Sequence, residues 1–333
     1  MIILAGDIGG TNTRLIAEEI NSDGRRILAE KIYYSADSSD LIPVINIFLS
    51  EHDISEPVYA ACFAVAGPVV AGSASVTNLP WVISEDVLAK ALDTPRIKLI
   101  NDFVAISYGI PELDDTDLLL IRQGEVSNDM PANHDAVIIG AGTGLGASHL
   151  VWQSDHYQPY ASEAGHAGFA PENTLQSELL AWLQKQYKHV SLETLLSGKG
   201  LITIYHFLRD VVGLSESLLI KEEMQETDPA QVITAYALSG SDELCQKTLD
   251  CFVEIYGAAA GNIALHYYPV GELYIAGGIA GKIKDKILSR NFIDAFLSKG
   301  AMSSNMEKIT LKLIMQAKVG LYGALSNARA LYC

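Results

Sequence analysis

The chain has 333 residues, of which 49% are hydrophobic and 19% charged, a balance typical of a globular protein with enough apolar material for two domains. A formal net charge of −17 argues against partners such as nucleic acid or an anionic membrane surface, and no apolar run is long enough to span a bilayer. The apolar residues before Asp7 are too few for a signal peptide, so we expect a cytoplasmic protein without a membrane anchor.

The first predicted element is a hairpin whose loop is unusually rich in glycine. The sequence GDIGGTNTR (6–14) lies between two apolar segments, which predicts a strand, a tight turn and a returning strand. A hairpin needs only one or two glycines. Three glycines plus the hydroxyls of Thr11 and Thr13 favour a loop whose N–H and O–H groups approach an anion. In this setting, Asp7 is a candidate to hold the water shell of Mg²⁺.

The following segments alternate between strand and helix patterns. They are a helix at 41–52, a buried strand at 58–69, a helix at 84–92 with Ser84 as its N-cap, and a strand at 96–103. This α/β pattern predicts that ligands bind at the carboxyl ends of the strands.

Asn101 and Asp102 stand at such a strand end, where a helix is expected to begin. Either residue could cap the helix, but a cap needs only one of them. The adjacent pair therefore favours a functional site. An amide that donates and accepts, beside a carboxylate that accepts, could hold neighbouring hydroxyl groups and remove a proton.

A second glycine-rich hairpin is predicted at 135–153. With an offset of 135 residues, Gly9 aligns with Gly144 and Leu15 with Leu150, which suggests an internal duplication whose two loops face one phosphate chain. The second loop also satisfies the pattern G-x-G-x-x-A of dinucleotide-binding folds. However, that motif must open a helix, and the alternating residues after it predict a strand. Neither Gly-Lys pair of the chain belongs to a P-loop motif.

The second half of the chain is mostly helical in pattern. Helices are predicted at 174–187, 191–208, 228–240, 241–268, from about 279, and at 317–331, with a strand at 272–278 that ends on two glycines. Such an end lets the backbone pass close to a flat ligand such as adenine or ribose.

Three polar residues of this half are candidate ligand groups. Glu163 and His166 lie in SEAGHAGFAP (162–171), a segment too rich in glycine to favour a helix, and polar recognition of a small ligand fits them better than a metal site. Glu193 is either a functional carboxylate or a solvated residue of the predicted helix. The four cysteines (Cys62, Cys245, Cys251, Cys333) lie far apart, so neither a disulfide framework nor a zinc site is expected.

Taken together, the motifs GDIGGTNTR, INDFVA, GAGTGLG, SEAGHAGFAP, ETLLSG and IAGGI resemble, in order and spacing, those of the bacterial ATP-dependent glucokinases. That family belongs to the actin-like ATPase superfamily, together with the hexokinases and Hsp70. The resemblance implies an α/β, ribonuclease H-like fold with a cleft between two domains. The small domain would comprise 1–111 and 313–333, and the large domain 112–312. It also implies a homodimer.

The resemblance assigns roles to individual residues. Asn101, Asp102, Glu163, His166 and Glu193 match the sugar-binding set, with Asp102 as the general base. The residues expected to bind ATP and Mg²⁺ are Gly6, Asp7, Ile8, Gly9, Gly10, Thr11 and Asn12 in the first loop, Gly142, Thr143 and Gly144 in the second, and Gly277 and Gly278 on the adenosine side. Related repressor–kinases carry a cysteine-rich zinc motif after the sugar-binding histidine. No cysteine follows His166 in HAGFAPENT, so zinc is not expected.

The expected reaction is the transfer of the γ-phosphoryl group of ATP to glucose. Acceptor-rich side chains suit a neutral hexose, and no cluster of Arg or Lys is present to bind an anionic acceptor. Two alternatives stay open. One is a kinase for another neutral hexose, such as mannose or fructose. The other is a non-kinase actin- or Hsp70-like ATPase, which should lack the constellation of Asn101, Asp102, Glu163 and His166.

Overall fold

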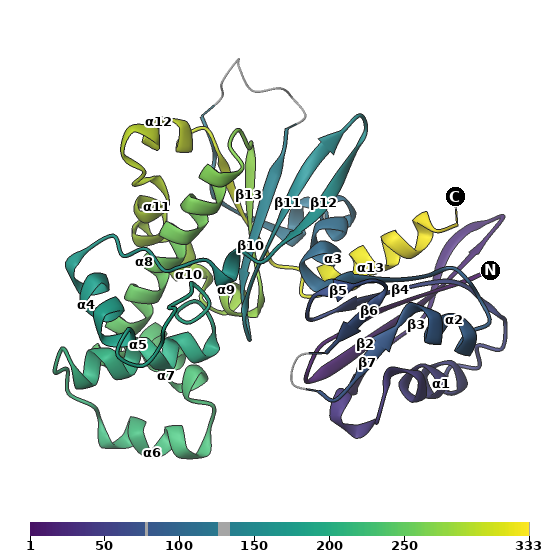
Figure 1. Ribbon diagram of the computed structural model, residues 1–333, viewed down its shortest axis with the longest axis horizontal. Helices are drawn as coiled ribbons and strands as arrows, with labels where there is room; N and C mark the ends of the chain where they lie inside the picture. The colour runs from purple at the N-terminus through teal and green to yellow at the C-terminus, as the bar shows by residue number, and fades with distance from the viewer. Residues whose placement is uncertain (77–78, 126–133, 333) are drawn as a thin grey trace. The chain divides into compact units, whose positions relative to one another are not determined.

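The computed structural model describes residues 1–76, 79–125 and 134–332, and the chain divides into two compact units (Figure 1). The first, here called the N-terminal unit, is Met1–Thr116 with Gln316–Cys333. The second, the central unit, is Asp117–Met315. The sequence predicted boundaries after residue 111 and before residue 313. In the structure they fall after Thr116 and before Gln316.

The N-terminal unit is built on a five-stranded sheet in the order β3-β2-β1-β4-β8. Strands β2 and β3 run antiparallel to their neighbours, whereas β1, β4 and β8 are parallel. The strands of this sheet are β1 (Ile2–Ile8), β2 (Asn12–Asn21), β3 (Gly24–Tyr34), β4 (Val58–Val65) and β8 (Ile97–Asn101). A smaller antiparallel sheet contains β5 (Val69–Val70), β6 (Ser73–Ser75) and β7 (Val82–Ser84). The predicted strand at 58–69 therefore ends at Val65.

Helices cover both faces of this sheet because its central strand alternates between two cores. Ile2 and Leu4 of β1 pack in a core that includes α1 (Leu41–Glu51) and α2 (Glu85–Ala91). Ile3 and Ala5 pack in a second core with α3 (Asp102–Gly109) and the C-terminal helix α13 (Val319–Ala330). The period of two in a strand thus explains why every residue of this apolar run is buried.

The central unit repeats the same strand order. Its sheet runs β12-β11-β10-β13-β14-β9, and the directions of its first five strands match those of β3-β2-β1-β4-β8. The strands are β9 (Leu118–Arg122), β10 (Ala136–Ala141), β11 (Leu145–Gln153), β12 (His156–Ser162), β13 (Glu272–Ala276) and β14 (Thr310–Ile314). The duplication predicted from the two glycine loops therefore extends over five strands.

The helices of the central unit form one large core with its sheet. They are α4 (Thr174–Leu183), α5 (Gly198–Asp210), α6 (Leu218–Glu226), α7 (Pro229–Ser239), α8 (Glu243–His266), α9 (Gly278–Lys282), α10 (Lys284–Ile287), α11 (Arg290–Leu297) and α12 (Ser303–Met306). The long helix predicted at 241–268 is confirmed as α8, and α7 is capped by Asp228 and ends at Gly240 in the left-handed region.

The predicted helix at 191–208 is wrong in its first third. Ser197 caps α5 by accepting a hydrogen bond from the Gly200 amide, so the residues before it form turns instead. The predicted N-cap Ser84 does stand at the start of α2, but its side chain makes no capping hydrogen bond. These differences lie at helix ends, where competing caps decide the boundary.

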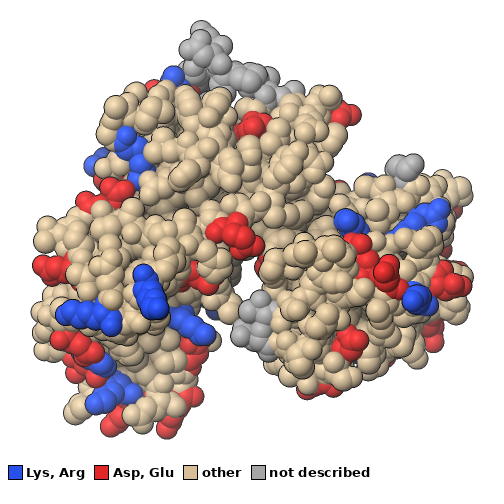
Figure 2. Space-filling view, in the orientation of Figure 1, with Lys and Arg blue, Asp and Glu red and all other residues tan. Residues whose placement is uncertain are grey.

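Figure 2 shows acidic and basic side chains interspersed on the face that it presents. Within the described residues, none of the helices combines the length and hydropathy needed to cross a bilayer. Cys62, Cys245 and Cys251 are buried free thiols, and Cys333 lies outside the described residues.

The packing of α13 on α3 generates a prediction about stability. A Cβ on Gly323 of α13 would overlap the carbonyl oxygen of Ala105 in α3, whereas a Cβ on Gly320 of the same helix would meet its nearest atoms at ordinary contact distances, 3.8–3.9 Å. Gly323→Ala should lower the free energy of unfolding by about 1–3 kcal/mol through overpacking. Gly320→Ala, the matched control, should leave it unchanged or slightly raised, because alanine favours a helix. Urea denaturation followed by circular dichroism measures both. Equal stability of the two variants would contradict this packing.

Candidate active site

The first glycine loop is a tight turn that is fixed by hydrogen bonds from Ser35. The Gly9 amide donates to the carbonyl of Asn12 (2.9 Å) across the turn. Ser35 donates its amide to the Thr11 carbonyl (2.9 Å) and its hydroxyl to the Gly9 carbonyl (2.9 Å). Thr13 is fully buried and its hydroxyl pairs with that of Ser35 (3.0 Å), so it is not the ligand donor that the sequence suggested.

The other predicted residues of this loop lie either within β1 or in the turn that follows it. Gly6 and Ile8 lie within β1, and a Cβ on Gly6 would come within 2.8 Å of the Phe63 ring. Gly10 and Thr11 lie in the turn itself, where Thr11 is exposed. The turn therefore presents backbone groups to solvent, while the strand residues fix its base.

Asp7 places a carboxylate at the carboxyl end of β1. Burial raises its pKa, and the guanidinium of Arg14, its partner in the β1–β2 register, opposes that rise. Gly320 at the start of α13 lies beside it, since an added Cβ there would stand 3.9 Å from Asp7 Oδ2. A carboxylate in this position would be stabilised by a cation.

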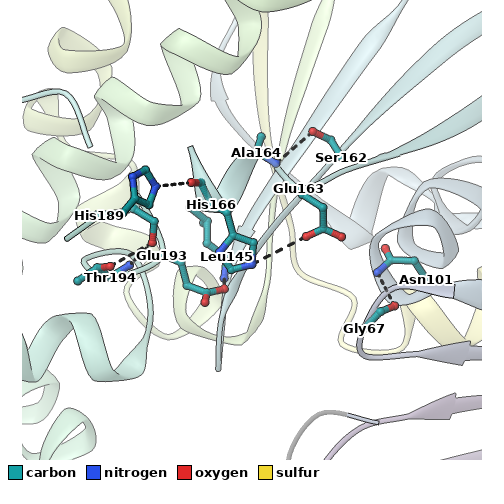
Figure 3. Close-up of polar contacts among 11 residues, drawn as sticks. Gly67, Asn101, Leu145, Ser162, Glu163, Ala164, His166, His189, Glu193 and Thr194 are labelled. Carbon is teal, nitrogen blue, oxygen red and sulfur yellow. Dashed lines mark hydrogen bonds and ion pairs between the residues drawn. The ribbon is translucent and has the colours of Figure 1, made fainter. Parts of the chain in front are cut away.

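The sequence left open whether Asn101 or Asp102 caps the helix, and the structure assigns the cap to Asn101. Asn101 is the N-cap of α3: its Oδ1 accepts from the amides of Phe103 (2.9 Å) and Val104 (3.3 Å), and its Nδ2 donates to the Gly67 carbonyl (3.1 Å), as Figure 3 shows in part. Asp102 Oδ1 also accepts from the Phe103 amide (3.0 Å). Because Asn101 already caps the helix, Asp102 is not needed for that purpose.

The pKa of Asp102 is raised to about 6. Burial is the main cause and the negative charge of Asp7 adds to it, while hydrogen bonds from the Phe103 and Asp102 amides and from Asn101 act in the opposite direction. A carboxylate with this pKa is mostly ionised at neutral pH and is a stronger base than an ordinary aspartate. The N-terminal unit thus contains two half-buried carboxylates, and the charge of Asp7 acts on the ionisation of Asp102.

The second glycine loop, in the central unit, closes in the same way. The Gly142 amide donates to the Gly144 carbonyl (2.8 Å), and the Gly142 carbonyl accepts from the Gly198 amide at the start of α5 (3.0 Å). Thr143 lies between the two glycines, between β10 and β11. As in the first loop, a backbone contact from a neighbouring segment fixes the turn.

Glu193 is bonded directly to this second loop. Its Oε2 accepts from the Leu145 amide (2.9 Å), and a Cβ on Gly144 would stand only 2.5 Å from the same oxygen (Figure 3). Glu193 makes this contact from a non-helical turn and not from the predicted helix at 191–208. The absence of a side chain on Gly144 leaves room for the carboxylate.

Glu163, His166 and Glu193 are brought together by one antiparallel contact. The Glu193 amide donates to the Gly165 carbonyl and the Leu192 amide to the Ala167 carbonyl (both 2.9 Å). Glu163 precedes the 3₁₀ turn Ala164–His166, and its Oε2 lies 4.0 Å from His166 Nε2 (Figure 3). Both side chains are more than 60% exposed, so they can contact a ligand. Polar recognition, rather than a metal site, fits this exposed group.

Gly277 and Gly278 form the junction between β13 and α9. Gly277 has φ +87°, and a Cβ on it would overlap the Ala141 carbonyl, whereas nothing lies within 4 Å of the position of a Cβ on Gly278. The junction therefore packs against the end of β10 on one side and is open on the other. Sequence reasoning found this glycine pair but missed Ser35, for which the sequence carries no signal.

Comparisons with known proteins agree with one another. A family model described as glucokinase matches residues 4–331. The glucokinase of Trichormus variabilis is 42% identical over 97% of each chain. The crystal structure of a glucokinase from an Antarctic psychrotroph superposes with a TM-score of 0.82, at 33% identity and 99% coverage of each chain. A glucokinase from Streptomyces griseus, solved with glucose and AMPPNP, has the same fold with a TM-score of 0.64, at 16% identity, covering 99% of this chain and all of that one.

The effect of the Asp7 charge on the pKa of Asp102 generates a prediction about the titration of Asp102. In the metal-free protein, Asp102 should titrate with a pKa of about 6. Asp7→Asn should lower that pKa, because it removes a negative charge that disfavours ionisation of Asp102. Carboxyl ¹³C shifts of labelled aspartate, assigned by comparison with Asp102→Asn, measure both values. An Asp102 pKa that is the same with and without the Asp7 carboxylate would contradict the coupling.

Proposed function

The chain belongs to the glucokinase family, and from this premise we infer that it is an ATP-dependent hexose kinase that transfers the γ-phosphoryl group of ATP to the 6-hydroxyl group of glucose. The products are glucose 6-phosphate and ADP. Its α/β fold is that of the actin-like ATPases, as expected from the sequence. The site observation that best supports this chemistry is the half-buried Asp102 carboxylate, with its pKa raised to about 6.

We propose that Asp102 is the general base. Its carboxylate would accept the proton of the 6-hydroxyl group as that oxygen attacks the γ-phosphorus in line. The bond from the sugar oxygen to phosphorus forms while the bond from phosphorus to the bridging oxygen of ADP breaks, and ADP leaves with the electron pair. The raised pKa favours this step, because a base works best when its pKa lies near the working pH.

The residues around the two glycine loops fit a nucleoside triphosphate. The loops at Gly9–Asn12 and Gly142–Gly144 would bind phosphate oxygens through backbone N–H groups other than those of Gly9 and Gly142, which close the turns. Gly277 and Gly278 would face the adenosine. Mg²⁺, when bound with ATP, neutralises phosphate charge. Among the described residues no three metal-ligating side chains cluster together, so Asp7 would hold the ion through water, with phosphate oxygens as its other ligands.

The sugar-binding set comprises Asn101, Asp102, Glu163, His166 and Glu193. Such side chains offer mostly acceptors, which match the several hydroxyl groups of an uncharged hexose. In the described chain, Glu163 and His166 are exposed and mutually close, and Glu193 keeps Oε1 for a hydroxyl while Oε2 accepts from Leu145. A kinase for another neutral hexose would use the same groups. ADP release measured across a panel of hexoses with Mg-ATP decides which sugar is preferred, and the absence of sugar-dependent turnover would refute the kinase.

We further propose that the enzyme is a homodimer that works in the cytoplasm and supplies glucose 6-phosphate to glycolysis. No nucleic acid or membrane partner is expected from a net charge of −17. Light scattering coupled to gel filtration tests the dimer, since it should give twice the mass of one chain.

Replacement of the base should separate catalysis from binding. Asp102→Asn keeps the size and polarity of the side chain but cannot take the proton, so kcat should fall about 10²–10⁴-fold while the affinity for glucose changes much less. In the unmodified enzyme, kcat/KM should fall as the pH is lowered through about 6, because protonated Asp102 is no longer a base. Steady-state kinetics at several pH values measures both effects. A folded Asp102→Asn variant with nearly normal turnover would leave the mechanism without its base.

The two sugar-binding glutamates should behave differently. Glu163→Gln should weaken glucose binding by about 1–3 kcal/mol, because a hydrogen bond to a charged group becomes one to a neutral group. Glu193→Gln should weaken glucose binding similarly and also raise the KM for ATP, since Glu193 holds the Leu145 amide beside the second loop. Calorimetry with glucose and kinetics with ATP measure these effects. Unchanged glucose affinity in both variants would refute the assignment.

A further inference from the structure

Tyr256 of α8 brings a hydroxyl group into the interior of the central unit. The residue has no exposed surface, and its ring makes edge contacts with Phe252 and Phe292, at centroid distances of 6.0 and 5.8 Å. A phenylalanine would fill the same volume. The burial of a hydroxyl is costly unless it is hydrogen-bonded, so its partners indicate what it contributes.

Those partners are the ends of two neighbouring strands. The Ala141 amide at the end of β10 donates to the Tyr256 hydroxyl (3.1 Å). The hydroxyl in turn faces the carbonyl of Ala276 at the end of β13 (3.3 Å) and that of Ile139 (3.4 Å). The hydroxyl oxygen therefore accepts a hydrogen bond from β10. Its single proton can be donated to a carbonyl of either β10 or β13.

The contact lies where the ladder between these strands stops. The last pair in the β10–β13 register is Gly140 with Ala276, and Ala141 is the next residue of β10. Both strands then enter glycine turns, at Gly142 and Gly277 respectively. A Cβ on Gly277 would overlap the Ala141 carbonyl, so the two turns start from backbones in direct contact.

We propose that Tyr256 is a positioning residue for the nucleotide: its hydroxyl fixes the separation between the loop at Gly142–Gly144 and the turn at Gly277–Gly278. This inference rests on the proposed function, in which the first of these elements binds phosphate and the second faces adenosine. A nucleotide that contacts both needs both in place at once. Loss of the hydroxyl leaves the Ala141 amide without this partner and lets the strand ends move apart.

Removal of the hydroxyl should therefore reduce the fraction of molecules that are ready to bind nucleotide. Tyr256→Phe should raise the Kd for AMPPNP with Mg²⁺ about three- to tenfold, in proportion to that fraction. The Kd for glucose should change less than about twofold, because Glu163 and His166 are held by contacts with other segments. The KM for ATP should rise more than kcat falls. Calorimetry with each ligand and steady-state kinetics provide these values.

Tyr205→Phe is the matched control. Tyr205 is equally buried, on α5 of the same unit, and within the described chain no hydrogen bond joins its hydroxyl to β10 or β13. This variant also loses one buried hydroxyl, but it should bind AMPPNP like the unmodified protein. Equal effects of the two substitutions on nucleotide affinity, or equal losses of nucleotide and glucose affinity in Tyr256→Phe, would overturn the proposal.

Hydrogen exchange on the unmodified protein provides a test that does not depend on the variant's folding. The Ala141 amide should exchange slowly even without ligand, since it donates to a fully buried hydroxyl, and fast exchange there would overturn the proposal. Failure of the proposed function would look different, because the unmodified protein would then bind no AMPPNP at all.

Discussion

The burial of Asp102 near the negative charge of Asp7 is the constraint on which the candidate chemistry of the N-terminal unit depends. Burial raises the pKa of both carboxyl groups, and the negative charge of Asp7 raises that of Asp102 further. The parallel ladder of β1, β4 and β8 brings both strand ends to one edge of the sheet. Asn101 adds the helix cap that fixes the start of α3. The raised pKa makes Asp102 a stronger base than an ordinary aspartate.

The two units share one arrangement of strands but carry different side chains at the strand ends. In both, a glycine turn joins the two strands of a hairpin, β1–β2 or β10–β11, and a later strand, β4 or β13, runs parallel to the first strand of that hairpin. The N-terminal unit places carboxylates beside its turn. The central unit instead places Glu193 on its turn and a second glycine junction at Gly277. A common frame fixes where a turn lies, while the residues that leave the strands decide what it can bind.

Elements with strong local sequence patterns could be predicted from the sequence. Elements that form only by pairing with other strands could not. The apolar run of β1, the cap of α7 and the length of α8 are local, and the structure confirms them. The edge strands β3 and β12 have weaker patterns, since pairing with β2 and β11 creates them. The candidate site divides in the same way. Motifs located Asp102 and Glu193, but the bond from Glu193 to Leu145 joins residues 48 positions apart, and no spacing rule predicts it.

The residues that hold the two glycine loops share one physical role, and sequence reasoning missed two of them, Ser35 and Tyr256. A loop can offer free backbone N–H groups to an anion only if its neighbouring backbone groups are bonded elsewhere, because an unrestrained turn would fold back on itself. Ser35 bonds the carbonyls of Gly9 and Thr11, so those groups cannot compete for the turn's amides. Glu193 and Tyr256 accept from the amides on either side of the second loop. Under the proposed function, these contacts hold the loops in place before phosphate binds, and the side chains that make them need not touch the nucleotide.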